Sequence, residues 1–139
     1  MGRILALDVG EQRTGFAITD EEKIISQALP ETADQHELLR VINEICNQYD
    51  IEKIVVGLPL TMSGEIGSQA QWVKSIGETI STETGKIVDY FDERLTTKQV
   101  LRNFEKDKNI PLDSLAAQAL LEQYLRKIKT QNAKGKTTS

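Results

Sequence analysis

Acidic residues in this sequence stand where short apolar segments begin or end. They are Asp8 near the end of the first run, Asp92 and Glu93 after a later run, and Asp113 at the start of the last amphipathic segment. In open α/β sheets, functional sites form beyond the carboxyl ends of strands, so acids from separate elements can meet at one edge.

Such a group of acids predicts a particular chemistry. Carboxylates that gather in one place repel each other and stay ionised only beside a positive partner. Mg²⁺ suits them because it is hard, prefers oxygen ligands and keeps several waters. Paired ions of this kind activate water and stabilise the leaving oxygen in phosphodiester hydrolysis. We therefore expect Mg²⁺ or Mn²⁺ as cofactor of a phosphodiester hydrolase.

Each acid also has a structural alternative. Asp8 could accept hydrogen bonds from the loop at residues 10–15, and Glu93 could form a surface ion pair. Asp92 could be a turn residue or an outer partner of a metal ligand. Asp113 is a good helix N-cap, and on spacing alone this alternative is favoured.

Other candidates could contact a substrate. Arg94 could hold a phosphate or form a surface ion pair, and Thr96 could bind a phosphate or cap a helix. Gly57 and Gly64 belong to a glycine-rich loop at residues 57–67 that could position a nucleic-acid strand. Trp72 could contact the same strand, although core packing is its commoner role.

The elements that position these residues follow from hydrophobic periodicity. Short apolar runs predict five strands, at residues 3–9, 15–20, 23–29, 53–57 and 86–91. Helical periodicity and capping signals predict helices from Asp34, at 68–83, at 97–104 and at 113–129. Short connections make the first three strands an antiparallel meander that ends at Pro30, and crossovers join the other two. The expected fold is α/β, a mixed five-stranded sheet with helices on both faces.

Composition sets further limits. The 139 residues fit one domain, expected at 1–129, followed by a disordered polar tail at 130–139. No apolar stretch approaches the roughly 20 residues of a membrane span. The single Cys46 cannot form a disulfide within the chain, and nothing in the sequence indicates export. We therefore expect a cytoplasmic protein. The lone histidine, His36, lies between polar neighbours and is expected to be exposed, which argues against a histidine-based hydrolase.

The charge distribution is uneven. The net charge is -4, which taken alone disfavours a nucleic-acid partner. Five cations and no acids follow Gln123, however, so the rest of the chain carries -9. This basic end could contact a nucleic-acid backbone or serve only as a solvated helix face and tail.

Four segments together resemble a known family. They are LALDVGEQRTGFA (5–17), IVVGLPLTMSGEIG (54–67), YFDERLTT (90–97) and DSLAAQALLEQYL (113–125). In order and spacing they resemble the YqgF family, also called RuvX, over essentially residues 1–127. The resemblance implies a ribonuclease H-like fold related to the resolvase RuvC. It also implies a nuclease for the 5′ end of pre-16S ribosomal RNA, with Holliday-junction resolution as an older suggestion.

The resemblance also bears on the site. It implies Asp8, Glu93 and Asp113 as the catalytic, metal-binding acids and favours Glu93 over Asp92. Many related nucleases carry a carboxylate on the fourth strand, where this chain has Gly57. The number of metal ions therefore stays open, and Asp92 or substrate phosphates could complete the metal's ligands.

Several functions compete. The leading expectation is hydrolysis of RNA by a monomer or weak homodimer, with an RNA precursor as first partner, branched DNA as second, and no membrane. A junction resolvase would share the acids but work as a two-fold dimer. A non-catalytic RNA-binding or ribosome-assembly protein is a further alternative. An ATPase of the actin and sugar-kinase type is disfavoured because those proteins bind nucleotide between two domains.

Overall fold

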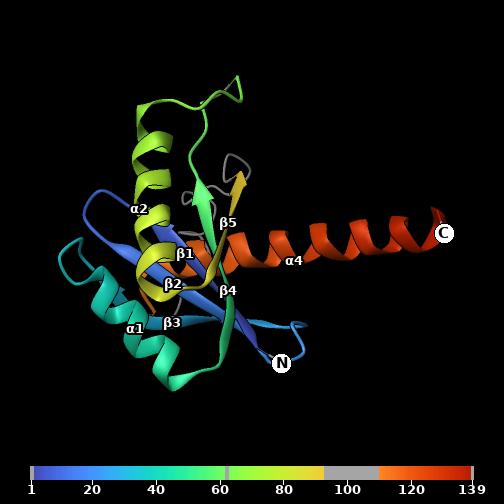
Figure 1. The fold of residues 1–139 in the computed structure, drawn as a ribbon, viewed down its shortest axis with the longest axis horizontal. Coiled ribbons are helices and arrows are strands. Elements are labelled where there is room, and N and C mark those ends of the chain that lie inside the picture. Colours follow the sequence, from blue (N-terminus) through green and yellow to red (C-terminus); the bar gives the residue numbers. More distant parts are fainter. Residues whose placement is uncertain (1, 62, 93–109, 139) are drawn as a thin grey trace.

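The computed structural model describes residues 2–61, 63–92 and 110–138 of the chain. Its strands are β1 (Arg3–Val9), β2 (Thr14–Thr19), β3 (Ser26–Ala33), β4 (Ile51–Leu58) and β5 (Ile87–Asp92). Its helices are α1 (Leu38–Gln48), α2 (Ser68–Thr84) and α4 (Leu112–Thr138). The five strands form one sheet in the order β3-β2-β1-β4-β5 (Figure 1).

The sheet is mixed, as the sequence predicted. β2 pairs antiparallel with both β1 and β3, whereas β4 pairs parallel with β1 and β5. Because successive side chains of a strand point to opposite faces, β1 divides its apolar residues between two cores. Leu5, Leu7 and Val9 belong to one core cluster, and Ile4 and Ala6 belong to the other.

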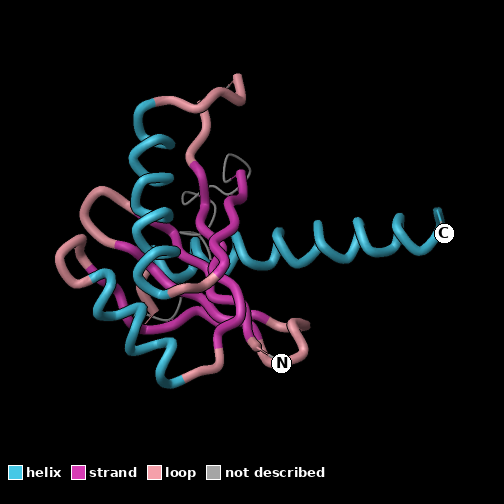
Figure 2. Tube along the Cα trace, in the orientation of Figure 1, coloured by secondary structure: helices cyan, strands magenta, loops and turns pink. Residues whose placement is uncertain are grey.

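One face of the sheet is covered by α1 and α2 (Figure 2). The apolar face of α1 buries Leu38, Val41, Ile42 and Ile45, as its periodicity predicted. The helix α2 ends at Thr84 and is capped by Gly85, whose φ of 70° lies in the left-handed region that glycine adopts without strain.

Among the described elements, α4 is the helix that covers the opposite face. Ala117, Leu121 and Leu125 pack there against Ile4 and Ala6 of β1. The sequence predicted a helix at 113–129 and a disordered tail from Thr130, but the helix continues to Thr138 and projects beyond the sheet (Figure 1). The backbone of a helix satisfies its own hydrogen bonds, so the polar composition from Thr130 onward does not by itself end the helix.

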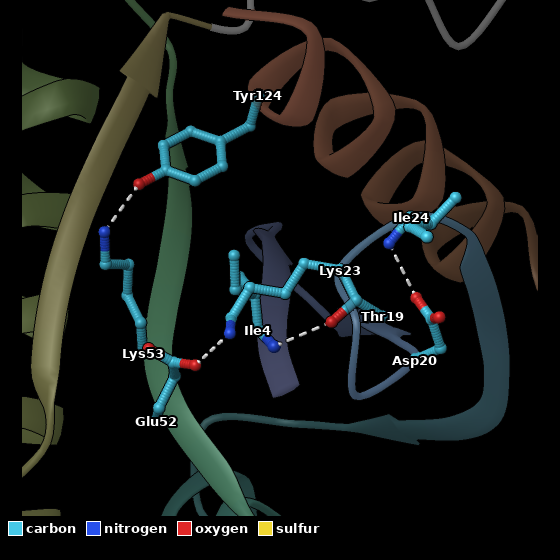
Figure 3. Close-up of polar contacts among 8 residues, drawn as sticks. All are labelled: Ile4, Thr19, Asp20, Lys23, Ile24, Glu52, Lys53 and Tyr124. Atoms are coloured by element: carbon cyan, nitrogen blue, oxygen red, sulfur yellow. Dashed lines mark hydrogen bonds and ion pairs between the residues drawn. The ribbon is translucent and has the colours of Figure 1, made fainter. Parts of the chain in front are cut away.

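Polar contacts also tie α4 to the sheet. Lys53 Nζ of β4 donates to the Tyr124 hydroxyl at 3.1 Å, and this hydroxyl donates to Asp89 Oδ2 of β5 at 2.8 Å. Figure 3 shows the first of these contacts, together with the turn after β2. In that turn Asp20 Oδ1 accepts hydrogen bonds from the backbone of Ile24, at 2.7 Å, and of the next residue.

The prediction for the third strand was wrong at both ends. It placed the strand at 23–29 and ended it at Pro30, whereas β3 contains Pro30. Proline is tolerated here because β3 is an edge strand and its pairing with β2 is irregular opposite Phe16. The following helix also starts later than expected: Asp34 Oδ1 accepts the Glu37 N–H at 2.9 Å, but this bond caps a turn, and α1 begins at Leu38.

Some predictions lie outside the described residues, namely the helix at 97–104 and the candidates Glu93, Arg94 and Thr96. None of the helices in the described ranges has the length and apolar character that crossing a membrane requires.

Candidate active site

Asp8 is a buried carboxylate near the end of the central strand β1. The residue is only 4% exposed. The alternation of β1 puts it on the same sheet face as Ile4 and Ala6, which is the face covered by α4. Its register partner is Gly15 of β2. Asp8 therefore lies under the part of α4 that crosses Gly15.

Gly15 lets the start of α4 approach the sheet very closely. A Cβ atom at this position would lie 2.1 Å from the carbonyl carbon of Asp113 and 2.3 Å from the nitrogen of Ser114. Only glycine permits such an approach between backbones. Because Gly15 is paired with Asp8, this contact brings Asp113, in the first turn of α4, to the carboxyl end of β1.

Ser114 fixes that first turn in place. Its fully buried hydroxyl accepts the backbone N–H of Phe16 in β2 and donates to the carbonyl oxygen of Glu31 in β3, both at 3.3 Å. These backbone groups lie where the β2–β3 register is irregular. The hydroxyl thus joins the helix start to two strands at the gap in their pairing.

Asp8 and Asp113 line one polar cleft of about 500 Å³, which we call the carboxylate cleft. One wall is the β1–β2 hairpin loop, held by a hydrogen bond of 2.9 Å from Gly10 N–H to Arg13 O. The helix α2 contributes Gln69 from its first turn. The full lining is Asp8, Val9, Gly10, Glu11, Gln12, Arg13, Gln69 and Asp113.

The charges of this cleft favour a cation. Asp8, Glu11 and Asp113 supply three carboxylates, and Arg13 is the one cation among the described residues of its lining. Mg²⁺ takes one or two protein carboxylates and fills its other positions with water, so an open, oxygen-lined cleft fits it. Within the described residues, no cluster of three or more His, Cys, Asp or Glu side chains has the geometry of a metal site. The described part therefore offers two predicted ligands, Asp8 and Asp113.

Asp92 is not brought to this cleft. It ends β5 in register with Leu58 of β4, which belongs to the core cluster beneath α1 and α2. Its position thus falls on the sheet face opposite to that of Asp8.

The two predicted glycines have structural roles. Gly57 is buried in β4, paired with Phe91. Gly64 has a φ of 86°, and its N–H donates to Thr61 O at 2.8 Å, so its conformation serves a turn. Neither glycine lines the carboxylate cleft in the described part of the chain.

Sequence reasoning missed Glu11, Arg13 and Gln69 as cleft residues. A signal for the first two existed: a short loop between antiparallel strands lies at the strand end that carries Asp8. No local pattern marks Gln69, which reaches the cleft only through the packing of α2. The exposed position of His36, in contrast, was predicted correctly.

The comparison with known families settles the relationship. Residues 2–127 match the family RuvX, described as a Holliday junction resolvase. The chain belongs to this family. Curated relatives of the chain bear the name "Putative pre-16S rRNA nuclease". One from Sulfurihydrogenibium sp. is 34% identical over 95% of both chains. Another, from Chloroflexus aurantiacus, is 42% identical over 88% of this chain and 85% of its own.

Solved structures confirm the fold. RuvC of Thermus thermophilus, determined in complex with a Holliday junction substrate, superposes with a TM-score of 0.62 at 15% identity and covers 91% of this chain and 96% of RuvC. The RuvX chain therefore has the expected ribonuclease H-like fold. Its family and curated relatives are those of nucleases.

Proposed function

We propose that this protein is a divalent-metal-dependent nuclease that hydrolyses phosphodiester bonds at the 5′ end of pre-16S ribosomal RNA in the cytoplasm. The observation that carries the chemistry is the meeting of Asp8 and Asp113, from the first strand and the last helix, in one polar cleft. The RNA substrate rests on the names of the curated relatives.

The residues of the cleft have distinct roles in this proposal. Asp8 and Asp113, with Glu93 next in sequence after β5, hold Mg²⁺ or Mn²⁺. When bound, the ion supplies Lewis-acid stabilisation of the charge that develops on the phosphate. Arg13, exposed on the hairpin wall, pairs with a phosphate oxygen of the bound strand. Ser114 and Gly15 position Asp113 and do not touch the substrate.

Arg94 and Thr96 are proposed as further phosphate contacts, on the strength of the DERLTT motif. Gly57 and Gly64 are proposed to act indirectly, by shaping the loop between β4 and α2. The basic surface of α4, which includes the exposed Arg126, Lys127 and Lys129, is available to the RNA backbone.

The test is cleavage of an RNA that carries the immature 5′ end, with Mg²⁺ or Mn²⁺. Asp8→Asn keeps the size of the side chain but removes its charge, and should lower the rate by at least about 100-fold, as loss of an electrostatic stabiliser commonly does. Chelation by EDTA should have the same effect. Asp50→Asn is the matched control, because Asp50 is exposed before β4 and outside the cleft lining. Unchanged cleavage by Asp8→Asn would refute the assignment.

Junction resolution is the second candidate, favoured by the family's description. It uses the same acids but needs two active sites related by a two-fold axis. A four-way DNA junction in the same assay, with sedimentation at the working concentration, separates the two candidates. Symmetric junction cleavage by a dimer would support resolution, whereas RNA cleavage by a monomer would exclude it.

A further inference from the structure

The carboxylate cleft continues into a second hollow. This hollow, of about 310 Å³, is lined by Glu11, Gln35, Ser68, Gln69 and Trp72, and we call it the Trp72 hollow. It shares Glu11 and Gln69 with the carboxylate cleft. A molecule bound at Asp8 and Asp113 can therefore extend across these two residues toward Trp72.

The Trp72 hollow also adjoins an apolar hollow between α1 and α2. That third hollow, of about 230 Å³, shares Gln35 and Trp72 with the second and is otherwise lined mainly by aliphatic side chains. Trp72 is half-buried and packs partly against the core, so it is both anchored and accessible. An anchored aromatic ring loses little conformational freedom when it binds a flat ligand.

The chemistry of the Trp72 hollow suits a nucleobase better than a phosphate. Glu11 is its one charged residue among those described, and its negative charge repels a phosphate. Gln35 and Gln69 offer amide donors and acceptors of the kind that pair with base edges. An indole ring offers a stacking surface that accepts any base.

We propose that Trp72 forms a stacking subsite for an unpaired nucleobase next to the phosphate held at the carboxylate cleft. The inference deepens the proposed nuclease function and rests on it. A base within a duplex is covered on both faces by its neighbours, so only a single-stranded or everted nucleotide can present a face to Trp72. The substrate class that follows is RNA with an unpaired segment beside the cleavage point.

Trp72 is the only tryptophan of the chain, so its fluorescence reports on the subsite directly. The Asp8→Asn protein, which on the proposed function binds RNA without cutting it, is titrated with a short unstructured RNA and with the same strand annealed to its complement. Stacking should quench the Trp72 emission with the single strand and leave it nearly unchanged with the duplex. Binding of the labelled single strand, followed by anisotropy, without any change in emission would overturn the proposal.

Substitutions provide the second arm. Trp72→Leu keeps apolar volume but removes the aromatic face, and should weaken single-strand binding about tenfold, whereas Trp72→Phe should retain most of it. Tyr49→Leu is the control, since Tyr49 packs on the same core cluster outside the three hollows. Circular dichroism verifies folding of each variant. Wild-type affinity in Trp72→Leu would overturn the subsite, while loss of cleavage in Asp8→Asn would still support the nuclease function.

Discussion

The substitution Gly15→Ala tests how the two acids are brought together. Its new Cβ would lie 2.1 Å from the Asp113 carbonyl carbon, whereas ordinary contacts begin near 3.4 Å. The start of α4 must therefore retreat from β2 by about 1.3 Å. The atoms in the way are backbone, so no side-chain rotation relieves the clash. The retreat displaces Asp113 relative to Asp8, because Asp8 is the register partner of Gly15.

The expected effect on catalysis is large for the addition of one methyl group. A misplacement of about 1 Å can cost about 100-fold in rate, and overpacking of this kind costs about 1–3 kcal/mol of stability. We expect Gly15→Ala to fold, to melt at a lower temperature and to lose about two orders of magnitude in cleavage rate. The cleavage assay, corrected for the folded fraction from urea denaturation, measures both effects.

Gly77→Ala separates the loss of stability from the displacement of Asp113. A Cβ at Gly77 would meet the Tyr90 hydroxyl on the α2 side of the sheet, so this variant is overpacked away from the cleft. It should lose stability yet cleave normally per folded molecule. If Gly15→Ala melts and cleaves like the wild type, or if both variants lose cleavage equally, the argument for close approach is refuted.

Two further predictions concern the attachment of α4. Ser114→Ala leaves the Phe16 N–H and Glu31 C=O without their hydroxyl partner, which should lower the free energy of unfolding by about 1–3 kcal/mol in urea. An unchanged urea midpoint would contradict the role of Ser114. Burial raises the pKa of Tyr124 above the usual 10.0, so the unfolded chain loses this proton first and stability falls as the pH rises above about 10. Tyr124→Phe should therefore flatten the decline in melting temperature at alkaline pH, with the similarly raised Tyr90 retaining part of it. An equally steep decline in both proteins would exclude this contribution.

Much of the fold was predictable because local pattern and tertiary burial agree. The strand at residues 3–9 was placed correctly, since β1 is central and its apolar run is bounded by polar residues and glycine. The helix predicted at 68–83 differs from α2 by one residue. β3 was misjudged because proline normally ends a strand, and only its place at an irregular sheet edge makes Pro30 tolerable.

The sequence predicted which residue types form the site better than it predicted how they are arranged in space. Asp8 and Asp113 do line one cleft, although Asp113 alone would have been interpreted as a helix cap. What brings them together is the contact of Gly15 with a helix that starts far along the chain, at Leu112. Short-range spacing does not encode such a contact. Asp92 also stands at the end of a strand, but it lies on the sheet face opposite to that of Asp8. One step along β5 decides which sheet face a residue occupies.

The order of β1 and α4 along the chain has a consequence for biosynthesis. A chain leaves the ribosome from its N-terminus, so β1 and Asp8 emerge before α4. Until α4 has emerged and docked, Asp113 is absent from the cleft, and Ile4 and Ala6 lack their packing partners on that helix. On the proposed function, the enzyme becomes able to hydrolyse RNA only after α4 has docked on the sheet. Truncated products that lack this helix would then not hydrolyse the ribosomal and messenger RNA that surround them during synthesis.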